Sequence, residues 1–142
     1  MSVDAVCVTP LKRIATPGGD VLHALKASDS SFRRFGEAYF SWVTPGAVKA
    51  WKCHLRMTLN LLVPVGLVRF AFCGQDSHGV FRTETVGESR YVRLTVPPGI
   101  WFGFQGMSEA PSLLMNLADI EHDPGEVLRK TVSEFDYDWN VK

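Results

Sequence analysis

The sequence predicts an all-β fold of the jelly-roll or sandwich type, with a short helical segment near the C-terminus. Glycine and proline, 12 and 8 of the 142 residues, divide the chain into short segments. Several of these segments alternate between apolar and polar residues and are rich in β-branched and aromatic side chains. The length suits one domain with a core of its own, so we expect residues 1–142 to form a single domain.

The expected strands are short and follow one another at the spacing typical of a sandwich or barrel. In the segment 68–73, for example, Val68, Phe70 and Phe72 share one strand face. In chain order the expected strands are 21–25, 37–43, 48–54, 58–63, 68–73, 80–85, 91–96, 101–104 and 112–117.

The segment 126–133 has the pattern of a helix. Asp123 and Pro124 precede it and supply a typical helix-start signal. An all-β chain with so little helix must protect its sheet edges by closing into a barrel, jelly roll or sandwich, and a jelly roll encloses a pocket. Polar residues on inward strand faces are therefore the informative ones.

Composition excludes several function classes. Lys plus Arg and Asp plus Glu both number 15, so no polyanion-seeking surface is indicated and we expect no nucleic-acid partner. The three cysteines are an odd count without metal-type spacing, which favours a reducing, cytoplasmic location. The apolar run 61–68 contains Pro64 and Gly66 and is too short for a membrane span, so we expect no membrane association.

The strand 48–54 carries the best candidates for chemistry. Alternation places Lys52 and His54 on one face and Lys49 on the other. If the first face lines the barrel, an ammonium and an imidazole lie close together, and each can depress the pKa of the other and supply a base near neutral pH. The alternative is an exposed face on which the pair is simply solvated.

Two other strands present polar side chains among apolar ones. Asn60 lies among aliphatic residues on the strand 58–63, where it is either a ligand contact or an amide that bonds to backbone, and the second is slightly favoured. Glu37 and Tyr39 share a face of the strand 37–43. That face can line a sugar site or form the solvated side of the sheet.

No metal or cofactor motif is found. His23, His78 and His122 have no ligand spacing, and helix-start chemistry explains the acidic residues around His122. Phosphate-loop, nucleophile-elbow and zinc-protease motifs are missing. Cys53 alternates away from His54, which disfavours a thiol nucleophile.

Five stretches together resemble a known family. The Pro-Pro-Gly-x-x-x-Gly-Phe stretch and the closing Asp-Trp are the more specific ones. The stretches are Gly36-Glu37-Ala38-Tyr39-Phe40-Ser41, Lys49-Ala50-Trp51-Lys52-Cys53-His54, Val63-Pro64-Val65-Gly66, Pro97-Pro98-Gly99-Ile100-Trp101-Phe102-Gly103-Phe104 and Asp138-Trp139. They are similar to the dTDP-4-dehydrorhamnose 3,5-epimerase group of cupins, and the central block also resembles the sugar-nucleotide 3,4-ketoisomerases.

This resemblance implies a cupin-type jelly-roll barrel, usually a homodimer, that binds a nucleoside-diphosphate 4-keto-6-deoxy sugar and removes a proton next to the ketone. Lys52 lies at the position of the epimerases' catalytic His, and Asn116 at that of their catalytic Tyr. Asp138 resembles the acidic partner of the His. His54 matches the second of two His in the ketoisomerases. Of the ligand positions of metal-binding cupins only His54 keeps a ligand, so we expect no metal and no cofactor.

The resemblance also suggests individual roles. His54 is the better candidate for the base, with Lys52 as the electrophilic group that stabilises the enolate. Lys49 and Arg56 are candidates to neutralise the diphosphate. Trp101 either stacks on the ligand or packs in the core.

The leading hypothesis is therefore an epimerase or isomerase of a nucleotide-linked keto-deoxy sugar, in a pathway that makes surface polysaccharide or a glycosylated product. The alternative is a cupin that kept the sugar-nucleotide pocket and lost the chemistry, because the standard His and Tyr positions are changed. A metal-dependent cupin enzyme is disfavoured by the missing ligands.

Overall fold

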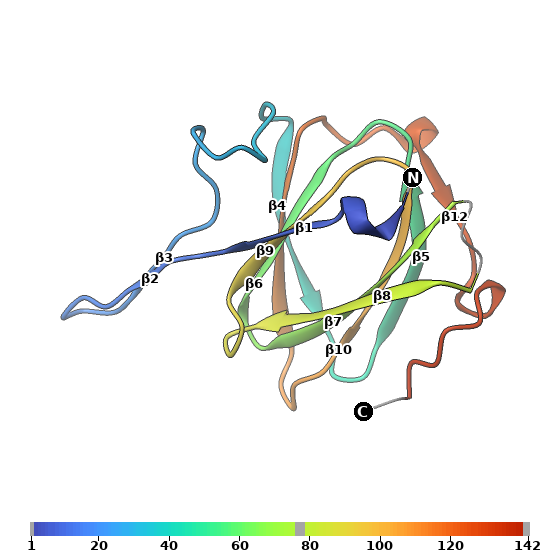
Figure 1. Ribbon diagram of the computed structural model, residues 1–142. Coiled ribbons are helices and arrows are strands. Elements are labelled where there is room, and N and C mark those ends of the chain that lie inside the picture. Colours follow the sequence, from blue (N-terminus) through green and yellow to red (C-terminus); the bar gives the residue numbers. More distant parts are fainter. Residues whose placement is uncertain (1, 76–78, 141–142) are drawn as a thin grey trace.

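A computed structural model describes residues 2–75 and 79–140, so His78 lies outside the described residues. Two five-stranded antiparallel sheets face each other, with strand orders β1-β9-β6-β11-β4 and β12-β5-β10-β7-β8, and β2 and β3 form a separate hairpin (Figure 1). The strands are β1 (Cys7–Pro10), β2 (Arg13–Ile14), β3 (Val21–Leu22), β4 (Glu37–Val43), β5 (Val48–His54), β6 (Leu59–Val65), β7 (Leu67–Gly74), β8 (Phe81–Gly87), β9 (Val92–Val96), β10 (Ile100–Gly106), β11 (Ser112–Ala118) and β12 (Val127–Arg129). Three short 3₁₀ turns are η1 (Val3–Ala5), η2 (Pro124–Glu126) and η3 (Val132–Glu134).

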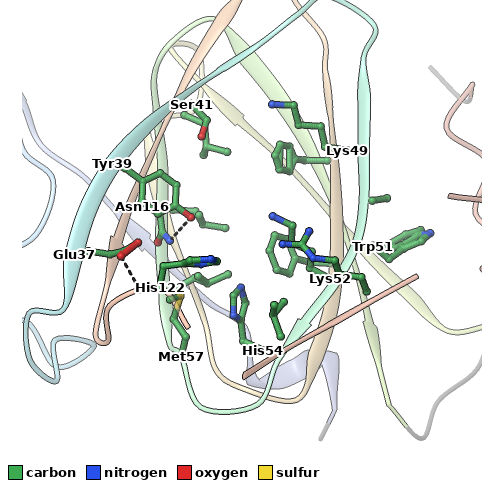
Figure 2. A pocket seen from close by; sticks show the side chains of 18 of the residues that line it. Glu37, Tyr39, Ser41, Lys49, Trp51, Lys52, His54, Met57, Asn116 and His122 are labelled. Carbon is green, nitrogen blue, oxygen red and sulfur yellow. Dashed lines mark hydrogen bonds between the residues drawn. The ribbon is translucent and has the colours of Figure 1, made fainter. Parts of the chain in front are cut away.

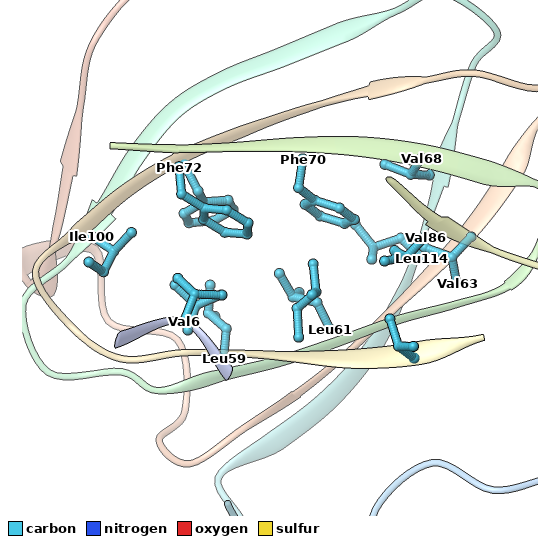
Figure 3. Close-up of a cluster of buried hydrophobic side chains, with 14 of the residues drawn as sticks. Val6, Leu59, Leu61, Val63, Val68, Phe70, Phe72, Val86, Ile100 and Leu114 are labelled. Atoms are coloured by element: carbon cyan, nitrogen blue, oxygen red, sulfur yellow. The ribbon is translucent and has the colours of Figure 1, made fainter. Parts of the chain in front are cut away.

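The main core fills one part of the space between the two sheets (Figure 3). Alternate residues of the facing strands supply it, among them Leu59, Leu61, Phe70, Phe72 and Leu94, all nearly or fully buried. The strand alternation predicted for 68–73 is confirmed, because the side chains of Phe70 and Phe72 stack with ring centroids 6.2 Å apart. This packing holds the two sheets apart at a fixed spacing and leaves the remaining space for a cavity.

A second apolar cluster lies on the outer face of the sheet that contains β5. The C-terminal segment crosses this face and contributes Phe135 and Trp139, which pack against Trp51 and Trp101. Burial of these aromatic side chains ties the C-terminal segment to the barrel.

The all-β class is confirmed, but the predicted helix over 126–133 is wrong. The Asp123-Pro124 signal does begin a turn, η2, in which the Asp123 side chain accepts a hydrogen bond from the Gly125 amide. The chain then continues as β12, which pairs with β5 so that Val127 faces His54. Tertiary pairing with an open sheet edge has overridden the local helical preference.

The segment between β3 and β4 is fastened to the outer face of the other sheet by Arg93 of β9. The guanidinium, with 1% of its side chain exposed, donates to the Ala24 carbonyl (2.6 Å), the Ser31 hydroxyl (2.7 Å) and the Asn60 side chain (3.2 Å). A carboxylate oxygen of Asp29 lies 3.4 Å away. Asn60 is thus a satisfied structural amide on the outer face. Beyond this segment the β2–β3 hairpin extends away from the two sheets (Figure 1).

Within the described part of the chain, no helix has the length and apolar character needed to cross a bilayer.

Replacing Arg93 by Met is expected to lower the free energy of unfolding by about 2–4 kcal/mol, because buried acceptors on Asn60 and in the segment before β4 lose their donor. Urea unfolding followed by tryptophan fluorescence measures the change. Arg56→Met serves as the matched control, since Arg56 forms an exposed ion pair that is expected to contribute less than about 1 kcal/mol. Equal losses in the two variants would contradict the anchoring role of Arg93.

Candidate active site

A cavity of about 440 Å³ opens between the two sheets (Figure 2). Strands β4 and β11 form one wall, strand β5 the opposite wall, and the segment after η2 one end. The base is apolar and includes Met57, Leu59, Leu61, Phe102, Phe104 and Leu114. A cavity of this size, with polar groups confined to its walls, fits a small organic ligand rather than a polymer.

A β-bulge in β5 sets the composition of the second wall. Lys52 pairs with Phe102 of β10, but the next pair joins Ala50 with Gly103, so Trp51 has no partner on β10. Because Trp51 is an extra residue in the strand, the side chain of Lys49 points to the same side of the sheet as that of Lys52. Both side chains therefore line the cavity. The prediction that Lys49 lies on the opposite face from Lys52 is therefore wrong, because strict alternation does not hold across the bulge.

The opposing strand makes the bulge possible. A Cβ atom at Gly103 would lie 2.5 Å from the Cβ of Ala50, so only glycine allows β10 and β5 to approach this closely. The side chain of Trp51 is directed away from the cavity into the outer aromatic cluster (Figure 2).

His54 is held by a buried carboxylate. Its Nδ1 hydrogen-bonds Oε1 of Glu126, and the second carboxylate oxygen accepts from the amides of Arg56 (3.1 Å) and Met57 (3.2 Å). The His54 side chain is 13% exposed and that of Glu126 is 2% exposed. With Nδ1 occupied by Glu126, the Nε2 edge of the imidazole is the one left for the cavity.

The charge state of Glu126 follows from these contacts. Burial alone would raise its pKa, but the hydrogen bonds from His54 and from the two backbone amides outweigh burial and hold the pKa below its ordinary value. Glu126 is therefore an anion at neutral pH, and it orients the His54 ring with Nδ1 as the protonated nitrogen.

Positive charge gathers on the same wall. Arg129 of β12 lies directly opposite Lys52 of β5, and Lys49 lies on the other side of Lys52. Partial burial in the cavity lowers the pKa of Lys52, and the charges of Arg129 and Lys49 lower it further. The ammonium of Lys49 donates to the Trp42 carbonyl at 3.3 Å. Like charges facing each other across two strands destabilise the empty site and favour an anionic ligand.

The opposite wall is neutral or acidic. The Asn116 amide donates to the Tyr39 hydroxyl at 3.1 Å, which leaves the hydroxyl proton of Tyr39 free to be donated elsewhere. Glu37 accepts a hydrogen bond from the backbone amide of His122 at 2.7 Å and so fixes the rim of the cavity (Figure 2). Ser41 completes this face of β4.

The structure thus brings together most of the residues singled out from the sequence. Glu37, Tyr39, Lys49, Lys52, His54 and Asn116 all line the cavity. Four others do not. Asn60 bonds Arg93 on the outer face, Trp101 packs in the outer aromatic cluster, Arg56 pairs with Asp123 at 2.6 Å on the surface, and the carboxylate of the exposed Asp138 accepts from the Asn140 amide at 2.9 Å. Asp138, which the resemblance gives as the acidic partner of the epimerases' His, is not among the cavity-lining residues, and the carboxylate beside His54 belongs to Glu126.

Sequence reasoning missed four lining or supporting residues, Glu126, His122, Arg129 and Lys130, because it read their segment as a helix start and helix. Lys130 also lies over the Trp101 ring at 5.2 Å. The Pro124-Gly125 pair is a turn signal, and the following alternation of Val127 and Arg129 toward one face would have indicated a strand.

Comparisons with known proteins agree with this geometry. No protein-family model matches the chain. A probable low-salt glycan biosynthesis epimerase of Haloferax volcanii is 31% identical over 114 residues, which is 74% of this chain and 73% of that protein.

Among solved structures, a dTDP sugar isomerase from Desulfovibrio desulfuricans superimposes with a TM-score of 0.91 at 35% identity, covering 96% of this chain and 92% of that one. A dTDP-4-dehydrorhamnose 3,5-epimerase from Sulfolobus tokodaii shares the fold, with a TM-score of 0.83 at 18% identity over 96% of this chain and 82% of that one. The protein therefore has the cupin fold expected from the sequence and belongs to the dTDP-sugar isomerase and epimerase family of cupins.

Proposed function

We propose that the protein is an isomerase that epimerises or ketoisomerises a dTDP-linked 4-keto-6-deoxy sugar by removing a proton from the carbon next to the ketone. The observation that carries this proposal is the His54–Glu126 pair beside Lys52 in the cavity between the two sheets. A base and a positive charge on one wall are what enolisation requires. The substrate class is supported by the names of the Desulfovibrio and Sulfolobus proteins, and a role in glycan biosynthesis by that of the Haloferax protein.

The chemistry proceeds in two proton transfers. His54, oriented by Glu126, accepts the proton of the carbon next to the ketone through Nε2, and the positive charge of Lys52 stabilises the electrons that move onto the ketone oxygen. Tyr39, whose hydroxyl projects from the opposite wall, is placed to return a proton from the other side. Protonation of the same carbon from that side inverts it. Protonation of the former carbonyl carbon moves the ketone instead, provided that the proton of the neighbouring hydroxyl passes to the old ketone oxygen.

Ligand binding divides between the two walls. Lys49 and Arg129 are placed to neutralise the diphosphate, since neither has a carboxylate partner among the residues described. Glu37 and Asn116 offer an acceptor and an amide to sugar hydroxyls. This assignment replaces Arg56 by Arg129, because Arg56 points to the surface.

We also propose that the protein is a homodimer. Strand β4 lies at a sheet edge, and its outward face exposes Phe40 (60%) and Trp42 (62%). These two residues pair with Met115 and Leu113 of β11, which extend the apolar face to a second strand. An apolar face two strands wide at a sheet edge favours burial against a second copy of the chain.

Replacing His54 by Asn is expected to reduce solvent exchange at the reacting carbon by about 10²–10⁴-fold, because the base is lost. The assay incubates the protein with dTDP-4-keto-6-deoxyglucose in deuterated water and follows deuterium at C3 and C5 by NMR and mass spectrometry. His23→Asn, the same change outside the cavity, should exchange at the wild-type rate. Binding of the substrate by the wild-type protein without any exchange would contradict the proposed reaction and favour a binding module.

Replacing Trp42 by Glu is expected to convert the dimer to a monomer, because a charge is placed in the apolar face of β4. Light scattering coupled to size-exclusion chromatography measures the mass. Val80→Glu is the control, since Val80 is similarly exposed (56%) but lies away from β4. A wild-type mass of about 15.8 kDa at micromolar concentration would contradict the dimer.

A further inference from the structure

Lys52 differs from the other two lysines of the cavity, Lys49 and Lys130, in having no partner for its ammonium among the described residues. Within residues 2–75 and 79–140 its ammonium makes no hydrogen bond or ion pair, whereas the Lys49 ammonium is held by the Trp42 carbonyl at 3.3 Å. Lys130 lies over the rings of Trp101 and Phe135, at 5.2 and 5.0 Å. The Lys52 amine is therefore free to engage a ligand.

The surroundings of Lys52 favour its neutral form. The side chain is partly buried in the cavity, Arg129 faces it across β12 and β5, and Lys49 flanks it across the bulge. All three features lower its pKa. A lysine amine that is desolvated and crowded by other cations becomes a nucleophile toward carbonyl carbon, which is the way lysines are activated for Schiff-base chemistry.

The position of Lys52 relative to the base suits such a step. Lys52 and His54 are two residues apart on one strand face, so their Cα atoms are roughly 7 Å apart. Both side chains point into the same cavity (Figure 2). A carbonyl carbon held at Lys52 therefore brings a neighbouring C–H within reach of His54.

We propose that Lys52 forms a Schiff base with the keto group of the sugar during the reaction. This inference rests on the proposed function and specifies how Lys52 activates the keto group. The Lys52 nitrogen bonds to the ketone carbon, the carbon–oxygen bond breaks, and the oxygen leaves as water with two protons of the original ammonium. The product is an iminium ion that keeps the third proton and the positive charge.

The iminium ion then withdraws electrons from the neighbouring carbon, as the ketone beside the positive charge of Lys52 does in the mechanism without a covalent bond. His54 removes the proton from the adjacent carbon, and the electron pair moves onto nitrogen to give a neutral enamine. Reprotonation of the same carbon from the Tyr39 wall restores the iminium with that carbon inverted, and one water molecule hydrolyses it to the epimerised ketone and free Lys52. Because the nitrogen stays on the original ketone carbon, this route yields epimerisation and not migration of the ketone.

The test uses the full chain with dTDP-4-keto-6-deoxyglucose and sodium cyanoborohydride, which reduces an iminium ion to a stable secondary amine. Intact-mass and peptide mass spectrometry are expected to show one adduct, on Lys52. Its rate of formation should rise with pH and reach half its maximum below pH 10.5, the ordinary lysine value. Lys12→Arg, the same type of change at an exposed lysine outside the cavity, should be labelled on Lys52 at the wild-type rate.

Lys52→Arg separates the covalent role from an electrostatic one, because arginine keeps the positive charge and cannot form the imine. We expect no adduct and at least a 10²-fold slower deuterium exchange, with thermal stabilisation by dTDP retained. Deuterium exchange at the wild-type rate in Lys52→Arg would overturn the Schiff base and leave the proposed function intact. Deuterium exchange in the wild-type protein without any adduct on Lys52 would do the same. No exchange and no adduct in the wild-type protein despite binding would overturn both.

Discussion

The buried carboxylate of Glu126 is the contact on which the arrangement of the site depends. One of its oxygens holds the His54 ring, and the other accepts the two amides that follow the end of β5. A buried anion is costly unless such donors surround it, so the turn η2, the start of β12 and the loop after β5 are fixed together. The same contact that closes one end of the barrel therefore sets the orientation of the imidazole.

The β-bulge in β5 gives the wall its charge. Without the extra residue at Trp51, Lys49 would project to the outer face and only Lys52 would reach the cavity. With it, Lys49, Lys52 and Arg129 surround one small volume, and their mutual repulsion is relieved when an anionic ligand enters. On the other side of the sheet, the extra residue Trp51 packs against Trp139 with ring centroids 5.4 Å apart. The bulge in β5 therefore links the positions of the lysines in the cavity to the packing of Trp51 in the outer aromatic cluster.

Much of the fold could be predicted from the sequence, because a strand with one buried face alternates between apolar and polar residues. The alternation in 37–43 and 68–73 appears in the structure as predicted, and it places Glu37 and Tyr39 on the cavity side of β4. The bulge could not be predicted, since it depends on Gly103 of another strand. The helix expected at 126–133 failed for the same reason. Residues 127–129 pair with β5, so the open edge of β5 decided between the helix signal at Asp123-Pro124 and the alternation of Val127 and Arg129. The carboxylate that holds His54 comes from Glu126 in this segment, whereas Asp138, which the resemblance gives as the acidic partner of the epimerases' His, is exposed.

Glu126 fixes His54 with its proton on Nδ1, so that Nε2 presents a lone pair to the cavity. Long-range ¹H–¹⁵N NMR of the imidazole, recorded at pH 8 on the wild-type protein and on Glu126→Gln, measures the tautomer directly. We expect the Nδ1–H tautomer for His54 in the wild-type protein, and its loss or mixing with the other tautomer in the variant. A wild-type His54 with its proton on Nε2 would contradict its role as the base, because that nitrogen could not accept a proton from the sugar.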